Sequence, residues 1–115
     1  MDLAADRAAI ADAANTVTGV KCSATYRQVT KVGDAAVRLD NMTRSVDGFG
    51  FMVTWQVLIS LGQDLARAEA WIDAHADSLI AALEGELVVG RLEAIELVLD
   101  TGKVPAVLVE GSRAA

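Results

Sequence analysis

A long alternating segment, residues 51–61, constrains the fold of this chain more than any other feature. Apolar side chains fall on every second residue, and polar Thr54, Gln56 and Ser60 lie between them. A period of two predicts a β-strand with one buried face. Because the segment is long and rich in β-branched residues, we expect a central strand of a sheet. Its apolar face consists of Phe51, Val53, Trp55, Val57, Ile59 and Leu61.

A helix is predicted directly after this strand. Gly62 ends the strand, Asp64 can cap the helix, and Gly85 closes it. Charged side chains such as Arg67 and Asp73 lie on the side opposite the apolar stripe. The stripe recurs every three or four residues, as in a helix packed on a core; its members are Leu65, Ala68, Ile72, Ala76, Leu79 and Leu83.

Three further elements are predicted before the central strand. Residues 2–17 carry an apolar stripe at helical spacing and end near Gly19, which predicts a first helix. Residues 20–26 alternate and predict a strand, and residues 35–43 predict a second strand. A loop over residues 44–50 then leads into the central strand, so we expect antiparallel pairing between those two strands.

The C-terminal part predicts two more strands, over residues 91–100 and residues 104–110, joined by a tight turn at Thr101 and Gly102. Pro105 lacks an amide donor, so the last strand is expected at a sheet edge, or the proline at its start. The inner face of the first of these strands is expected to carry Ile95, Leu97 and Leu99.

The predicted order is helix, three strands, helix, two strands, and residues 111–115 are expected to be a short tail. Helices packed on one face of a mostly antiparallel sheet define an α+β fold. The length of 115 residues fits one domain, residues 1–115. The two runs of strands can form one continuous sheet.

Composition excludes several classes of protein. An apolar content of 53% is too high for a disordered chain, and no apolar run approaches the ~18 residues of a membrane span. Acidic Asp2, Asp6 and Asp12 argue against a secretory signal, and a single cysteine against internal disulfides, so an intracellular chain is expected. The net charge of −6 argues against tight binding to nucleic acid.

The sequence offers few groups for catalysis. His75 lies at the edge of an apolar stripe without a second ligand at metal-binding spacing, so we interpret it as a packing residue. Asp73 and Asp77 are one helical turn apart on a face expected to be solvated. Glu93 and Glu96 differ by three along a strand and must point to opposite faces. We therefore predict no catalytic residue, no metal site and no enzyme.

Two other motifs are also interpreted as structural. Cys22 falls on the predicted inner face of residues 20–26, where cysteine behaves as a small apolar residue. Gly48, Phe49 and Gly50 resemble part of a phosphate-binding loop, but a strand and not a helix follows them. No cofactor is predicted.

The central part of the chain resembles small tail proteins of long-tailed phages infecting actinobacteria. This part consists of the strand over residues 51–61, the Gly62-Gln63-Asp64 connection and the helix with Ala68, Trp71, Ile72, Asp73, Leu79 and Leu83. The order of elements over nearly the whole chain is similar to the tail terminator family, whose best-known member comes from phage lambda. The resemblance rests on the order of the elements and on their general residue pattern, and no single motif carries it.

The resemblance implies a structural virion protein, assembled in the host cytoplasm, at the head-proximal end of the tail. Such proteins form a hexameric ring on the tail tube, stop its polymerisation and contact the head-completion proteins. They are not enzymes, and DNA passes through the ring without specific binding. The acidic balance of the chain suits a lumen that repels phosphate. A head-completion or neck protein of the same virion is the alternative within this class.

Within the loop over residues 44–50 and just before it, Met42, Arg44 and Phe49 are candidate contacts to a neighbouring subunit or to the tube. An ordinary flexible hairpin loop is the competing interpretation. Outside the phage class, the chain can be a small dimeric binding module, with an apolar ligand held between sheet and long helix beside Trp55 and Trp71. An enzyme that uses His75 is the third alternative.

Overall fold

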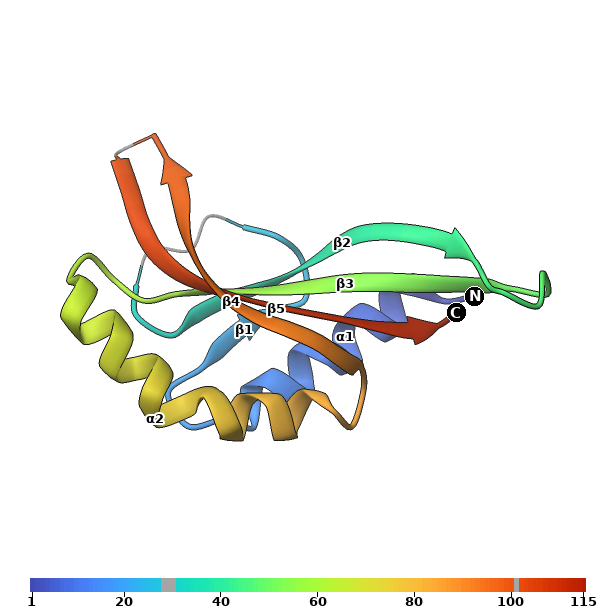
Figure 1. Ribbon diagram of the computed structural model, residues 1–115, viewed down its shortest axis with the longest axis horizontal. Helices are drawn as coiled ribbons and strands as arrows, with labels where there is room; N and C mark the ends of the chain where they lie inside the picture. Colours follow the sequence, from blue (N-terminus) through green and yellow to red (C-terminus); the bar gives the residue numbers. More distant parts are fainter. Residues whose placement is uncertain (28–30, 101) are drawn as a thin grey trace.

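The computed structural model describes residues 1–27, 31–100 and 102–115. Two helices and one five-stranded sheet make an α+β fold, with the helix–three strands–helix–two strands order that the sequence predicts. Both helices lie on the same side of the sheet (Figure 1). The elements are α1 (Leu3–Asn15), β1 (Lys21–Ser23), β2 (Asp34–Arg44), β3 (Phe51–Ser60), α2 (Leu65–Leu83), β4 (Val88–Leu99) and β5 (Gly102–Ala114).

The strands lie in the order β1-β2-β3-β5-β4. β3 therefore lies in the centre, as its pattern predicts, and the predicted antiparallel pairing with β2 is confirmed. It also pairs antiparallel with β5. The β1–β2 pair is parallel, and the other three pairs are antiparallel. The two runs of strands do form one continuous, mostly antiparallel sheet.

The core lies between the helices and the face of β3 that the alternation marks. Trp55 has no exposed surface, and the guanidinium of Arg7 in α1 lies 5.1 Å from the centre of its ring. Ile10 of α1 and Leu79 of α2 are also fully buried. Both helices begin at aspartate caps: Asp2 accepts from the Ala5 N–H, and Asp64 accepts from the N–H groups of Ala66 and Arg67. The predicted Asp64 cap is thus confirmed.

The first helix ends earlier than predicted, since α1 stops at Asn15, two residues before the predicted end. The end of the second helix is as predicted: α2 stops at Leu83 with Glu84 as its cap residue, and Gly85 follows directly. The first predicted strand is also shorter, since β1 covers only Lys21–Ser23 and Tyr26 lies outside it, about half exposed. A three-residue edge strand gains little from sheet pairing, which is why the alternating pattern of residues 20–26 overestimates it.

The C-terminal predictions need larger corrections. β4 begins at Val88 and not at the predicted Arg91. The strand continues through Gly90 because a bulge between Val89 and Arg91 accommodates this residue. Residues 111–115 are not a tail, since β5 continues to Ala114 and pairs with β3 as far as Met52. Gly111 allows this close packing, because a Cβ there would come within 2.9 Å of the Val88 carbonyl oxygen. The predicted turn at Thr101 and Gly102 falls partly outside the described residues.

The edge position predicted for the last strand is wrong, because β5 lies between β3 and β4. Pro105 is its fourth residue, close to the start of the strand, as the other alternative predicted. The Leu61 N–H donates to the Pro105 carbonyl oxygen at 2.9 Å. Proline has no N–H to return that bond, so pairing between β3 and β5 ends at Ser60 and Ala106.

The expected inner face of β4 is also wrong. Ile95 and Leu97 pair with Ala106 and Val104, whereas the β5 residue that packs among the helices is Val107, on the other face. Ile95, Leu97 and Leu99 are only half-buried and lie on the sheet face opposite the helices. The error arises because β4 is an edge strand with apolar residues on both faces.

Candidate assembly surfaces

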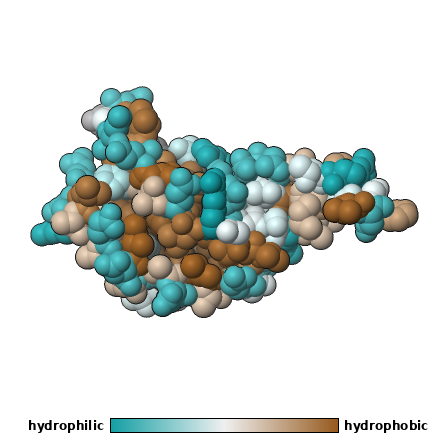
Figure 2. Space-filling view, viewed as in Figure 1, coloured by the Kyte–Doolittle hydropathy of each residue, from teal (hydrophilic) through white to brown (hydrophobic). Residues whose placement is uncertain are grey.

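The turn between β2 and β3 forms a narrow projection at one end of the molecule, the right end in Figure 1. We call residues 44–51 the arm. Two apolar side chains at its tip, Val46 and Phe49, are exposed, and Phe49 is 92% accessible. Figure 2 shows apolar surface at the end of this projection. Large apolar groups this far from the core contribute little to folding, and covering them with a partner removes their apolar surface from water.

Hydrogen bonds within the arm define its shape. The Ser45 N–H donates to the Gly50 carbonyl oxygen at 2.8 Å, and the Gly48 N–H donates to the Ser45 carbonyl oxygen at 2.9 Å. The Asp47 carboxylate accepts from the Ser45 hydroxyl at 2.6 Å and from the Phe49 N–H at 3.0 Å. These bonds, that from Ser45 first, lower the pKa of Asp47 below its usual value. The arm is thus a turn whose backbone is fixed by hydrogen bonds on both sides of Phe49.

The three predicted contact residues do not share one surface. Phe49 is at the tip, while the guanidinium of Arg44 lies 4.3 Å from the centre of the Phe51 ring. Met42 is partly buried and packs against the core. Val46, which the sequence interpretation did not single out, is fully exposed beside Phe49. An apolar residue in a polar loop between two strands was the available signal for it.

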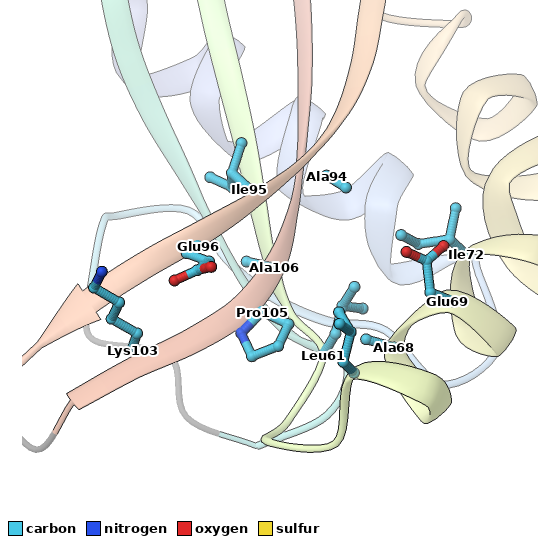
Figure 3. Close-up of a pocket in the computed structure, with 11 residues that line it drawn as sticks. Leu61, Ala68, Glu69, Ile72, Ala94, Ile95, Glu96, Lys103, Pro105 and Ala106 are labelled. Carbon is cyan, nitrogen blue, oxygen red and sulfur yellow. The ribbon is translucent and has the colours of Figure 1, made fainter.

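A cleft of about 660 Å³ lies at the other end of the molecule, between the first half of α2 and the β4–β5 hairpin. Figure 3 shows side chains of α2 on one side of this gap and those of the hairpin on the other. Leu65, the first residue of α2, is 66% exposed, although the sequence predicts it in the buried stripe. The apolar lining comes from Leu61, Leu65, Ala68, Ile72, Ala94 and Pro105, and the cleft is also bordered by Ile95 and Ala106, a pair on the other face of the hairpin.

Three charged side chains complete the lining of the cleft: Glu69 on α2, Glu96 on β4 and Lys103 on β5 (Figure 3). Over residues 1–27, 31–100 and 102–115, no ion pair includes any of them. Trp55 and Trp71 do not line this cleft. Trp55 is buried in the core instead, and Trp71 stacks on His75.

A polar row crosses the sheet face opposite the helices. Arg38, Gln56, Glu110 and Arg91 are direct neighbours on β2, β3, β5 and β4. Arg38 donates to the Gln56 side-chain oxygen, the Gln56 amide donates to Glu110 at 3.3 Å, and Arg91 donates to Glu110 at 3.2 Å. Both hydrogen-bonding groups of the buried Gln56 side chain have a partner, Arg38 for its oxygen and Glu110 for its nitrogen, so the row stabilises the sheet.

The candidate catalytic groups lie apart from one another. His75 stacks on Trp71 with ring centres 4.1 Å apart, and its Nδ1 lies 2.9 Å from the Trp71 carbonyl oxygen. Asp73 and Asp77 are exposed, as predicted. Among the described residues, no group of three His, Cys, Asp or Glu side chains could hold a metal ion. Glu93 and Glu96, opposite Leu108 and Pro105, lie on opposite faces of β4 as predicted.

Cys22 lies in β1, partly buried beside α1. Burial raises the pKa of its thiol to about 11, and the charge of Arg27 opposes this change. The Asn15 side chain accepts from the Cys22 N–H at 2.7 Å and donates to the Cys22 carbonyl oxygen at 3.0 Å. A thiol held protonated behaves as a packing group, in line with its interpretation from the sequence.

The Gly48-Phe49-Gly50 motif lies in the turn of the arm, followed by β3. No helix in the described part of the chain is long and apolar enough to cross a membrane. In comparisons with known proteins, no family model and no curated protein matches this chain. The surfaces to explain are therefore the arm and the cleft, within an α+β fold.

Proposed function

We propose that this chain is a structural protein of the tail of a long-tailed phage. In this proposal it acts as a tail terminator: copies form a hexameric ring on the tail tube, end its polymerisation and join it to head-completion proteins. It performs this role in the virion, after assembly in the host cytoplasm, and it is not an enzyme. Binding and packing against other proteins are then its whole chemistry.

The observation that carries the proposal is the arm. Phe49 is exposed at the tip of a turn fixed by its own hydrogen bonds. Rigid aromatic anchors are typical of protein–protein contacts, because little conformational freedom is lost when they bind. The charge of −6 supports the role too, since acidic subunits around a lumen let DNA pass without holding it.

The proposal is tested by electron microscopy of the purified chain, alone and mixed with the major tail tube protein. We expect six-fold rings, or monomers that assemble into such rings on tube ends, and tubes of limited length. Phe49→Asp is expected to reduce ring formation at least tenfold, and Val88→Asp, at an exposed residue outside the arm and the cleft, serves as the matched control. A stable dimer that ignores the tube protein would contradict the proposal.

A neck protein of the same virion has the same need for ring contacts. The two roles differ in partner: a terminator binds the tube end, and a neck protein binds the head-completion complex. Pull-down of the purified chain with each partner separates them. A gene found immediately before the gene for the major tail protein would support the terminator, and another position would favour the neck protein.

A small dimeric ligand-binding module is the second candidate, and the apolar cleft is the observation that favours it. Because Trp55 and Trp71 do not line this cleft, their fluorescence is a poor reporter of a ligand there. Titration with an apolar fluorescent dye, followed by displacement with candidate ligands, tests this function. Saturable displacement by one compound class at micromolar concentration would support it over the terminator.

A further inference from the structure

The arm and the cleft lie at opposite ends of a molecule whose longest dimension is 46 Å (Figure 1). The arm is the turn between β2 and β3, and the cleft lies between the start of α2 and the β4–β5 hairpin. Phe49 therefore cannot enter the cleft of its own chain. A contact between these two surfaces must join two copies.

The two surfaces match in size and polarity. The arm tip offers one aromatic and one aliphatic side chain, Phe49 and Val46. The cleft has about 660 Å³ and a mainly apolar lining from Leu61, Ala68, Ile72 and Pro105. An apolar cavity of about 150 Å³ already accommodates a benzene ring. One cleft therefore has room for both side chains at the tip.

Their charges are also complementary. The arm carries Arg44 and Asp47, and Asp47 is ionised at neutral pH like any exposed aspartate; its hydrogen bonds lower its pKa further. The cleft carries Glu69 and Glu96 of one sign and Lys103 of the other. Each charge of the arm thus has an opposite charge available at the cleft. Such pairs orient an approaching partner more than they strengthen its binding.

We propose that the arm of one copy inserts Phe49 into the α2/β4–β5 cleft of the next copy. The contact uses different surfaces on its two sides, so it is heterologous, and repeated copies must close into a ring or extend as a filament. This inference deepens the proposed function and rests on it for closure of the ring, although the contact itself does not depend on a phage role.

Two variants separate the two sides of the contact. Phe49→Ala removes the anchor and leaves the cleft intact. Leu65→Asp places a charge in the cleft and leaves the arm intact; an acidic residue at the first position of a helix is well tolerated, which preserves the fold. Val88→Ala, at an exposed residue outside both surfaces, is the control. Circular dichroism first verifies that all variants are folded.

The measurement is the mass in solution, by light scattering and sedimentation equilibrium from micromolar to millimolar chain. We expect the wild type and Val88→Ala to assemble, and each of the other variants alone to remain a monomer of 12.1 kDa. A mixture of Phe49→Ala with Leu65→Asp has one intact arm and one intact cleft per pair. It is therefore expected to give a 1:1 dimer and nothing larger.

Three results would overturn the inference: a wild type that is monomeric throughout, single variants that assemble like the wild type, or a mixture that stays monomeric. An apolar dye reports other occupants of the cleft. The dye is expected to bind monomeric Phe49→Ala at least tenfold more tightly than the assembled wild type. Equal binding to both would mean that the cleft is open in the assembly, and would also overturn the inference.

The inference and the proposed function fail in different ways. Six-fold rings that persist in both single variants would leave the terminator role standing and remove the arm–cleft contact. Loss of tube binding in Leu65→Asp with intact rings would assign the cleft to the tube protein, again against the inference. The assembly can also be a filament, or a ring of another symmetry that excludes the dye. If both variants disrupt such an assembly, the result would support the arm–cleft contact and contradict the hexamer.

Discussion

Residues of the same kind are buried in the middle of the molecule and exposed at its two ends. Trp55 in β3 has no exposed surface beneath α1, whereas Phe49, six residues earlier in the same hairpin, is almost fully exposed. In α2, Leu79 is fully buried and Leu65 is mostly exposed. The contrast separates residues that hold this chain together from residues available to another chain.

The physical reason is a difference in length. α1 has 13 residues and α2 has 19, which correspond to about 20 Å and about 28 Å of helix. The molecule is 46 Å long, so neither helix runs along its full length. The β2–β3 turn extends past both helices and forms the arm, and the far part of the β4–β5 hairpin bends away from α2 and forms one wall of the cleft (Figure 1).

The largest expected difference in the free energy of unfolding is between truncation of Trp55 and truncation of Phe49. Trp55→Ala should lower the free energy of unfolding by about 3–5 kcal/mol, because it opens a cavity in the core. Phe49→Ala should change it by less than about 0.5 kcal/mol, because no packed contact is lost. Urea unfolding of dilute, monomeric protein gives both values. Equal losses would show that the arm is part of the core.

The same comparison can be made within one helix. Leu79→Ala should cost about 2–5 kcal/mol, and Leu65→Ala at the mouth of the cleft about 0.5 kcal/mol or less. Thermal unfolding at low concentration checks both. A large loss at Leu65 would mean that the start of α2 packs closely on β4–β5, and that the cleft is closed in solution.

A smaller effect is expected where the C-terminal strand meets both helices. Arg113 of β5 lies 3.4 Å from Asp6 of α1 and 2.9 Å from Glu86 just after α2. Arg113→Met should cost about 1 kcal/mol, since the three groups are partly solvated. The loss should shrink in 1 M salt. Urea unfolding at low and high salt tests this, and no loss would favour the tail predicted for residues 111–115.

The last effect concerns pH and appears only in alkaline solution. Burial raises the pKa of Cys22 to about 11 from a reference value of 9.0, so folding favours the neutral thiol. The stabilisation is complete below pH 9 and is lost as pH rises towards 11. Wild type should therefore lose more stability than Cys22→Ala between pH 8 and pH 10.5, in matched urea titrations. Parallel pH profiles would show that the thiol is not desolvated.

Periodicity and caps predicted much of the fold. The alternation around Trp55 placed β3 in the centre and identified the face that packs on the helices, and Asp64 marked the start of α2. The prediction that only this face is buried is wrong, because Gln56, Leu58 and Ser60 on the other face are buried too. The same alternation predicted the wrong inner face where apolar residues do not pack against the helices. Ile95 alternates like a core residue but lies on the other face of an edge strand.

The candidate surfaces were predictable only in part. The loop that contains Phe49 could be recognised, because turn residues separate two strong strand patterns. The position of Met42 could not, since the bulge between Leu39 and Asn41 shifts the register of the residues that follow. The ligand-binding alternative placed an apolar site between the sheet and the long helix, but it named Trp55 and Trp71 as the lining, which is wrong. The actual walls could not be identified, because α2 and the β4–β5 hairpin are far apart in the sequence.

The sequence by itself determined the class of fold, the order of its elements and the face of its central strand that packs on the helices, since these depend on periods of two and of 3.6 residues along the chain. Only the tertiary structure decided that β5 lies inside the sheet, that residues 111–114 continue it, and that Leu65 and Phe49 are exposed at opposite ends. Those properties depend on which segments meet in space and how far the helices reach, and neither is encoded locally.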